Sequence, residues 1–212
     1  MNLIKFTRSI FLICCLLFIA GIQPGFKWKI NAMAQENIIS QESILELSPQ
    51  EKLDLEQGNV VLKGQKGNYL GRVLAQGDID TAWEVLSDND NFDRFLPNIA
   101  ASKIITEEGD RIVFEQINVV DLWLFKQEFK VQIEAIKNKP TQVDFRIIDG
   151  DLKKLIGRWE ISQTASGKIL VSHGVEVEPG SETEKPFFYG VYESTLEDTL
   201  KAISQEISQR SL

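Results

Sequence analysis

The chain has 212 residues and carries 23 Lys and Arg against 31 Asp and Glu, which gives a net charge of −8 at pH 7. This acidic balance argues against binding to nucleic acid, because that binding depends on Lys and Arg side chains that neutralise phosphates. Both cysteines, Cys14 and Cys15, lie near the N-terminus. The rest of the chain therefore has no thiol with which to form a disulfide or hold a metal.

Residues 1–34 have the pattern of a signal peptide that is removed after export. Lys5 and Arg8 precede an apolar run over residues 10–22, and Ala32-Met33-Ala34 matches an A-x-A cleavage site. A retained membrane anchor is the alternative, but the apolar run is shorter than the roughly 20 residues of a spanning helix. We expect cleavage before Gln35 and export across the cytoplasmic membrane, into the periplasm or an equivalent lumen.

Residues 35–58 are predicted to form an N-terminal arm followed by a short helix. Ser48-Pro49-Gln50-Glu51 matches a capping box with proline at the first helical position, so the helix should begin there and end near Gly58. The remaining residues, 59–212, are enough for one domain with a sizeable core.

This domain is expected to open with a strand and two short helices. Residues 59–77 have the pattern of a strand that a turn or bulge interrupts at Gly64 and Gly67. A helix should begin near Asp80, with Asp78 or Asp80 as its cap. Polar turn formers at residues 87–91 should end it. The apolar residues of the two helices are Ile79, Ala82, Trp83 and Leu86, then Phe92, Phe95, Leu96 and Ile99.

From residue 101 to residue 179 the pattern changes to strands joined by short turns, which predicts an antiparallel sheet. The clearest strand alternates Phe125, Gln127, Phe129, Val131 and Ile133 with charged or polar residues, so one face should be apolar and the other solvated. A last helix should begin near Pro186, because apolar residues recur every three or four positions from Phe188 to Ile207. This stripe should cover the apolar face of the sheet.

The order and spacing of several short motifs resemble a known family. The motifs are Gly67-Asn68-Tyr69, Ala82-Trp83-Glu84-Val85-Leu86, Asp90-Asn91-Phe92, Phe95-Leu96-Pro97-Asn98, Gly150-Asp151, Gly157-Arg158-Trp159 and Val177-Glu178-Pro179. From Val60 to about Arg210 the chain is similar to polyketide cyclase/dehydrase and lipid-transport proteins of the START-like superfamily, close to the coenzyme Q-binding branch. It departs from that pattern at Asn89 and His173, where the family leads us to expect an aromatic residue, usually Tyr.

The resemblance implies an α+β helix-grip fold, in which a curved antiparallel sheet and a long C-terminal helix enclose a deep cavity. Relatives use this cavity to hold lipids, quinones, polyketides or hormones. Inward polar residues favour a cavity over a closed core, because buried polar groups without partners cost about 1 to 3 kcal/mol each. The predicted ligand contacts are Gln116, Asn118, Phe125, Phe129, Phe145, Trp159, His173, Val175 and Tyr192.

His173 is the only histidine, and catalysis by it would require an orienting partner that the sequence does not reveal. A zinc site needs three or four ligands, which one histidine without cysteine cannot supply. We therefore predict no metal, no cofactor and no catalytic residue. The favoured function is that of an exported protein that binds a lipid, a quinone or another apolar small molecule. Such a protein can make transient contact with a membrane surface. The alternatives are a cyclase/dehydrase-type enzyme acting on a polyketide-like ligand and a non-catalytic scaffold with a closed core.

Overall fold

A computed structural model describes residues 47–122, 125–181 and 185–212, apart from the side chains of residues 121, 122, 125, 126, 185 and 186. All of them lie in one compact unit that runs from Glu36 to Leu212. The predicted signal peptide and its cleavage site lie outside the described residues. No helix within the described ranges is long and apolar enough to cross a bilayer.

Helix α3 (Pro49–Glu56) forms where the capping box predicts it. The Ser48 hydroxyl accepts a hydrogen bond from the Glu51 N–H at 3.2 Å, and the Glu51 carboxylate accepts one from the Ser48 N–H at 2.7 Å. These two bonds satisfy N–H groups that the start of a helix leaves free. Leu55 of this helix packs with Val61 and Leu74 in a small cluster separate from the main core.

The predicted interrupted strand is instead a hairpin of two strands, β1 (Val61–Gln65) and β2 (Asn68–Ala75). Lys66 and Gly67 form the turn with φ angles of 53° and 93°. Positive φ at both central residues is typical of a tight two-residue hairpin, because its twist matches that of the strands. A side chain at Gly67 would also collide with the backbone oxygen of Val177 on the neighbouring strand.

The predicted pair of short helices follows this hairpin. Helix α4 (Ile79–Ser87) is capped by Asp78 rather than Asp80, because the Asp78 carboxylate accepts a hydrogen bond from the Thr81 N–H at 2.7 Å. The polar stretch that we predicted as a turn forms a 3-10 helix, η1 (Asn89–Asn91), and helix α5 (Phe92–Phe95) comes directly after it.

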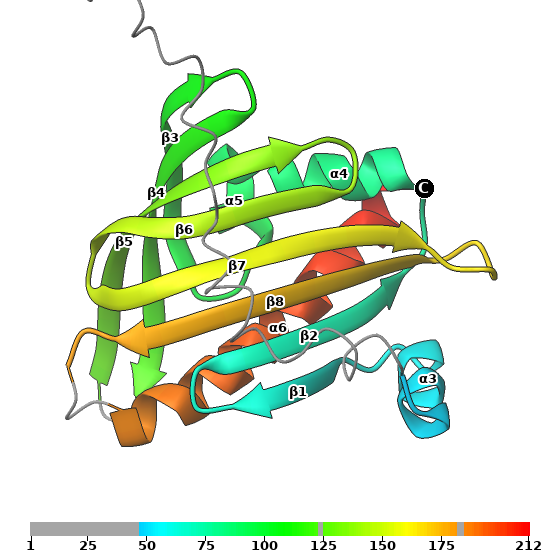
Figure 1. Cartoon of the computed structure of the whole chain (residues 1–212), viewed down its shortest axis with the longest axis horizontal. Helices are drawn as coiled ribbons and strands as arrows, with labels where there is room; N and C mark the ends of the chain where they lie inside the picture. Colours follow the sequence, from blue (N-terminus) through cyan, green and yellow to red (C-terminus); the bar gives the residue numbers. More distant parts are fainter. Residues whose placement is uncertain (1–46, 123–124, 182–184) are drawn as a thin grey trace, which may run out of the picture. The chain divides into compact units, whose positions relative to one another are not determined.

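Six further strands complete the sheet. They are β3 (Ile99–Glu108), β4 (Arg111–Leu122), β5 (Phe125–Asn138), β6 (Gln142–Gly150), β7 (Leu152–Gln163) and β8 (Ile169–Pro179). The eight strands lie in the order β1-β2-β8-β7-β6-β5-β4-β3, and each pair of neighbours is antiparallel. Helix α6 (Lys185–Arg210) crosses one face of this sheet (Figure 1).

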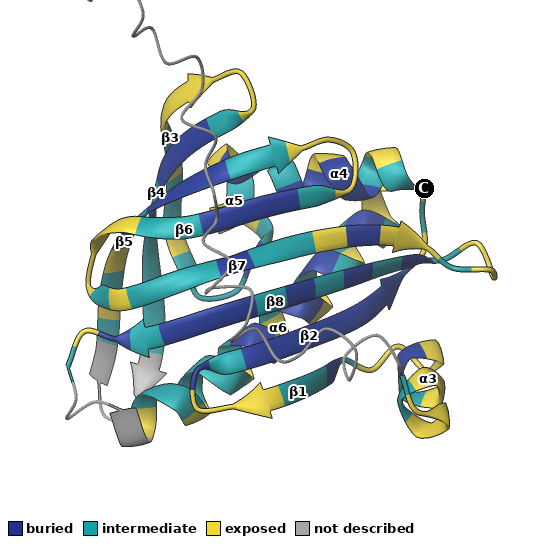
Figure 2. Ribbon diagram, viewed as in Figure 1, coloured by how far each residue is buried: buried dark blue, intermediate teal, exposed yellow. Residues whose placement is uncertain are grey.

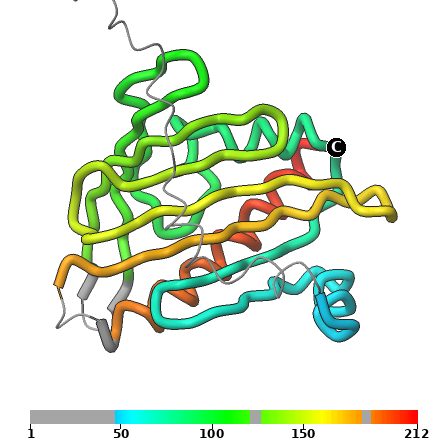
Figure 3. Tube along the Cα trace, in the orientation of Figure 1, coloured from blue at the N-terminus to red at the C-terminus, as the bar shows by residue number. Residues whose placement is uncertain are grey.

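Helix α6 packs on β2, β8 and α4. Its stripe of Leu196, Leu200, Ile203 and Ile207 is at most 5% exposed and belongs to the same core as Val73 and Val171. Figure 2 shows this burial along the middle of β2 and β8. The end of α6 lies beside the end of β2 (Figure 3), where the Ser208 hydroxyl accepts a hydrogen bond from the Gln76 N–H at 3.1 Å. The predicted helix-grip fold is therefore confirmed, with an unclosed sheet.

The prediction that the outer face of β5 is solvated is wrong at Glu134. This carboxylate is only 6% exposed and binds both Arg111 and Arg146 at 2.6 Å. Burial acts to raise the pKa of Glu134, but hydrogen bonds from the two arginines hold it below its ordinary value. Asp144 on β6 is equally buried and binds Arg158 at 2.6 Å. Cross-strand pairing therefore lets charged side chains cover one another, which alternation along one strand does not reveal.

Candidate ligand cavity

A cavity of about 830 Å³ lies between the inner face of the sheet, helix α6 and the segment from α4 to α5. This volume is within the range of small-molecule sites in proteins. Most of the wall is apolar, and it is formed by β3 to β8 together with α4, η1, α5 and α6. Representative apolar lining residues are Leu86, Phe92, Phe114, Val131, Ile133, Phe145, Leu155, Val191, Leu196 and Ile203.

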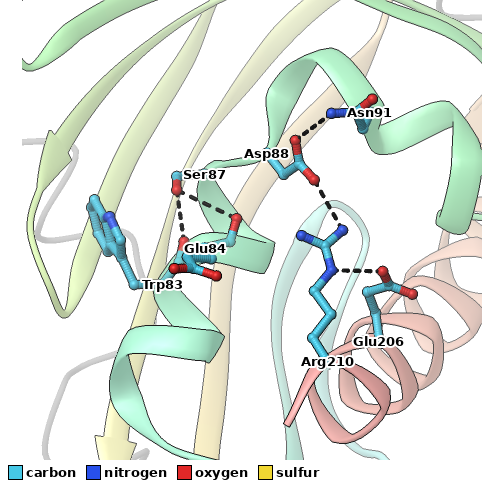
Figure 4. A network of polar contacts seen from close by, with 7 residues as sticks. All are labelled: Trp83, Glu84, Ser87, Asp88, Asn91, Glu206 and Arg210. Atoms are coloured by element: carbon cyan, nitrogen blue, oxygen red, sulfur yellow. Dashed lines mark hydrogen bonds and ion pairs between the residues drawn. The ribbon is translucent and has the colours of Figure 1, made fainter. Parts of the chain in front are cut away.

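The wall formed by α4, η1 and α5 is tied to the last turn of α6 by a polar network (Figure 4). Arg210 donates hydrogen bonds to Asp88 at 2.9 Å and to Glu206 at 2.7 Å, and Asn91 donates to Asp88 at 2.6 Å. The Arg210 guanidinium also lies 5.3 Å from the centre of the Phe95 ring. Burial acts to lower the pKa of Arg210, but its two carboxylate partners raise it above its ordinary value. The network therefore holds this part of the wall against the helix.

His173 contributes to the wall from β8. Its imidazole stacks on Trp159, with ring centres 3.7 Å apart, and on Phe145, with ring centres 5.5 Å apart. The residue is 5% exposed, and burial lowers the pKa of His173 to about 3, although the backbone of Arg158 acts in the opposite direction. The ring is therefore neutral near pH 7. Its Nδ1 atom is enclosed by protein and has no well-formed hydrogen bond among the described residues.

A second group of polar side chains lies on β4 and η1. Gln116 and Asn89 line the cavity and are 8% and 4% exposed, and Asn118 lines it two residues further along β4. The Ser102 hydroxyl donates a hydrogen bond to the Asn89 backbone oxygen at 2.6 Å, and Ser102 pairs with Gln116 across β3 and β4. The two amides therefore belong to the same side of the cavity. The Asn89 Oδ1 atom is enclosed without a hydrogen-bond partner in the described part of the chain.

Tyr192 of α6 stacks with Tyr69 of β2 and with Phe188, at ring-centre distances of 5.8 Å and 5.7 Å. The Tyr69 hydroxyl donates a hydrogen bond to Glu193 at 2.8 Å. Burial raises the pKa of Tyr69 to about 12 and raises that of Tyr192 further above its ordinary value, so both phenols stay protonated. These contacts hold the turn of α6 around Tyr192 on the sheet.

The described lining residues include no ionised side chain at neutral pH. The polar ones are Asn89, Gln116, Asn118, Gln127, His173, Tyr192, Thr195 and Thr199. Because a buried charge without a partner is strongly unfavourable, this wall suits an uncharged ligand. Phe187, at the start of α6, lines the cavity and is 77% exposed, so the cavity reaches the surface there.

Most of the predicted ligand contacts lie in this one wall: Gln116, Asn118, Phe129, Phe145, Trp159, His173 and Tyr192. Their contact with a ligand stays a prediction. Val175 does not line the cavity, although it shares the inward face of β8 with His173. It is 2% exposed and pairs with Tyr69, in the part of the sheet that the Tyr69–Tyr192 stack covers. The side chain of Phe125 lies outside the described residues.

The prediction omitted several lining residues. Leu155 was detectable, because it lies two positions before Gly157 and four before Trp159 on the same face of β7. Asn89, Phe92, Phe187 and Thr199 were not, because their positions depend on how the helices fold back over the sheet. In the described part of the chain, no three potential metal ligands cluster together.

Comparisons with known proteins agree with this geometry. Residues 76–204 match the family model for polyketide cyclase / dehydrase and lipid transport. None of the curated proteins compared with the chain matches it significantly.

Solved structures with low sequence identity share the fold. The Zhui aromatase/cyclase from a Streptomyces species is 13% identical with a TM-score of 0.57, over 72% of this chain and 96% of that one. A STAR-related lipid transfer protein from Xanthomonas axonopodis is 16% identical with a TM-score of 0.57, over 70% and 92%. A START superfamily protein from Mycobacterium smegmatis is 17% identical with a TM-score of 0.57, over 72% and 99%.

Proposed function

Because this chain belongs to the polyketide cyclase/dehydrase and lipid transport family, we propose that it binds one uncharged apolar molecule in the cavity beneath α6. The cavity of about 830 Å³, with its apolar wall and few neutral polar groups, carries the proposal. An ionised head group would find no counter-charge among the described lining residues. A free fatty acid carboxylate or a phosphate therefore fits the interior poorly.

Within this class we favour a neutral lipid or a quinone of the coenzyme Q type. The similarity to a lipid transfer protein supports the first, and the short motifs of the sequence support the second. We also propose that the protein acts after export, on the basis of residues 1–34. A mature N-terminus at Gln35 in protein recovered from the cell envelope would support export, and an intact leader would contradict it.

A cyclase/dehydrase-type reaction is the second candidate, favoured by the aromatase/cyclase of similar fold and by His173 in the cavity wall. A general base is most effective when its pKa lies near the working pH. Burial lowers the pKa of His173 to about 3, and no carboxylate is among the groups that act on it. Binding without catalysis is therefore the better-supported function.

The first experiment identifies the ligand and its affinity. Mass spectrometry of molecules that copurify with the mature protein should find an uncharged apolar compound. A ligand that buries about 300 Å² of apolar surface gains roughly 7.5 kcal/mol, part of which association costs remove. Titration with a short-chain ubiquinone should therefore give a Kd in the micromolar range or weaker.

The second experiment fills the cavity. Ala135 lines it from the middle of β5 and is 1% exposed, so Ala135→Phe should occupy ligand space and weaken binding at least tenfold without lowering the melting temperature. Glu128→Gln, on an exposed position of the same strand, is the matched control and should leave the Kd unchanged. In a closed core the larger residue would instead cost about 1 to 3 kcal/mol of stability. A destabilised Ala135→Phe, in a protein that takes up no apolar probe, would establish the closed-core scaffold.

A further inference from the structure

The cavity wall contains a polar group whose hydrogen-bonding capacity the protein itself leaves unused. His173 is only 5% exposed and lines the cavity. Stacking on Trp159 and Phe145 fixes its ring. Two aromatic neighbours hold the ring in place but offer no hydrogen bond in its plane. A buried polar group that remains unpaired is unfavourable, so a hydrogen bond from a bound molecule to the ring nitrogen that reaches the cavity would be stabilising.

The surroundings of the ring determine which partner it needs. Nδ1 is enclosed by protein atoms, so the edge of the ring that contributes to the cavity wall is the one that carries Nε2. Trp159 is the cross-strand partner of His173, so the backbone of the preceding residue, Arg158, lies beside the imidazole and acts on it. A backbone carbonyl can only accept a hydrogen bond, so we assign the proton of the neutral ring to the enclosed nitrogen. Nε2 is then the nitrogen that can accept a hydrogen bond from a molecule in the cavity.

We propose that His173 selects ligands that present a hydroxyl group to its Nε2 atom, so that the cavity takes an uncharged alcohol or phenol in preference to the matching ether. The inference rests on the proposed function, because it requires a molecule in the cavity. A hydroxyl donates to Nε2 without bringing a charge into a wall that has no counter-charge among its described residues. An ether oxygen or the carbonyl of an oxidised quinone cannot donate, so among the proposed ligands a lipid alcohol or the reduced quinol form fits best. An ammonium group would have to be buried without a carboxylate. His173 is thus a specificity-determining residue rather than a catalytic one.

The test compares two probes of nearly equal size, 2-naphthol and 2-methoxynaphthalene, which differ in the ability to donate a hydrogen bond. Their Kd values are measured near pH 7 on the full mature protein and on His173→Phe, which keeps an aromatic ring beside Trp159 and Phe145. The ratio of the ether Kd to the alcohol Kd is compared between the two proteins. This comparison cancels the difference in hydrophobicity between the two probes. This ratio should fall about tenfold from wild type to His173→Phe. His173→Gln, which retains a hydrogen-bond acceptor, should recover most of it.

The outcomes separate this inference from the proposed function. An equal ratio in wild type and His173→Phe, with both probes bound, would overturn the role of His173 and leave the binding function standing. A wild-type preference for the alcohol that persists in His173→Phe would have the same meaning, because another polar group such as Gln116 would then be the partner. Failure of both probes to bind wild type would overturn the binding function and this inference together. His173→Leu provides a second loss variant if His173→Phe does not fold.

Discussion

His173 should make the folded protein sensitive to mild acid, and His173→Phe should remove that sensitivity. Burial lowers the pKa of His173 from an ordinary 6.5 to about 3 in the folded state. Between these values the unfolded chain binds one proton more than the folded chain does. The free energy of unfolding therefore falls as the pH falls through this window, and the full contribution is present only above about pH 6.5.

The magnitude follows from linkage. Each pH unit below 6.5 costs the wild type about 1.36 kcal/mol relative to a protein without this titration. At pH 4.5 the loss amounts to about 3 kcal/mol, which is a substantial part of the 5 to 15 kcal/mol that stabilises a typical domain. Carboxylates such as Glu134 also respond to acid, but their contribution is common to both proteins and cancels in the difference.

Urea unfolding of both proteins at pH 7.5, 6.5, 5.5 and 4.5 measures this effect. The free energy of unfolding of the wild type, relative to that of His173→Phe, should fall by about 3 kcal/mol between pH 7.5 and pH 4.5. Parallel curves over this range would refute the reasoning, because they would show that His173 binds its proton equally well in both states. The comparison requires that the free energy of unfolding depends on urea concentration with the same slope in both proteins.

Three further substitutions test separate features of the fold. Gly157→Ala should lower stability by about 1 to 3 kcal/mol, because the new Cβ would collide with the Phe145 ring and the Gly174 backbone oxygen; an unchanged thermal midpoint would contradict this packing. Gly190→Ala, at an open position inside α6, should stabilise by about 1 kcal/mol in the same thermal assay. Glu134→Gln should cost about 1 kcal/mol at pH 7, because both arginine partners are 42% exposed. Since the pKa of Glu134 is lowered in the folded state, this deficit should shrink as the pH falls below about 4.5, and a deficit that stays constant would show that the charge does not matter.

Local signals predicted much of the fold. The capping box at Ser48 and the acidic cap before α4 are interactions within four residues, so the sequence contains all that determines them. The alternation of β5 and the spacing of apolar residues in α6 predicted which faces meet in the core. The β1–β2 turn was less clear, because Lys66 occupies a positive φ position where glycine or asparagine is the usual signal.

The cavity depended on information that is not local. Alternation placed both His173 and Val175 on the inner face of β8, but only His173 lines the cavity. The difference arises because Tyr69 and Tyr192 stack over the part of the sheet where Val175 lies, and these tyrosines are far apart in the sequence. Asn89 joins the wall through a hydrogen bond from Ser102, which no periodicity could indicate.

Helix α6 has one firmly held end and one loosely held end. Leu200, Ile203 and Ile207 are at most 2% exposed and Arg210 is bound to Asp88, whereas Phe187 is 77% exposed beside the cavity. The free energy of local opening rises with the number of buried contacts that must separate, so the first turns open far more often than the last. If the cavity binds a ligand as proposed, we expect it to enter through brief separation of these turns while the core under the second half stays closed. We therefore expect the rate of ligand exchange to follow this local opening and not the global stability of the protein.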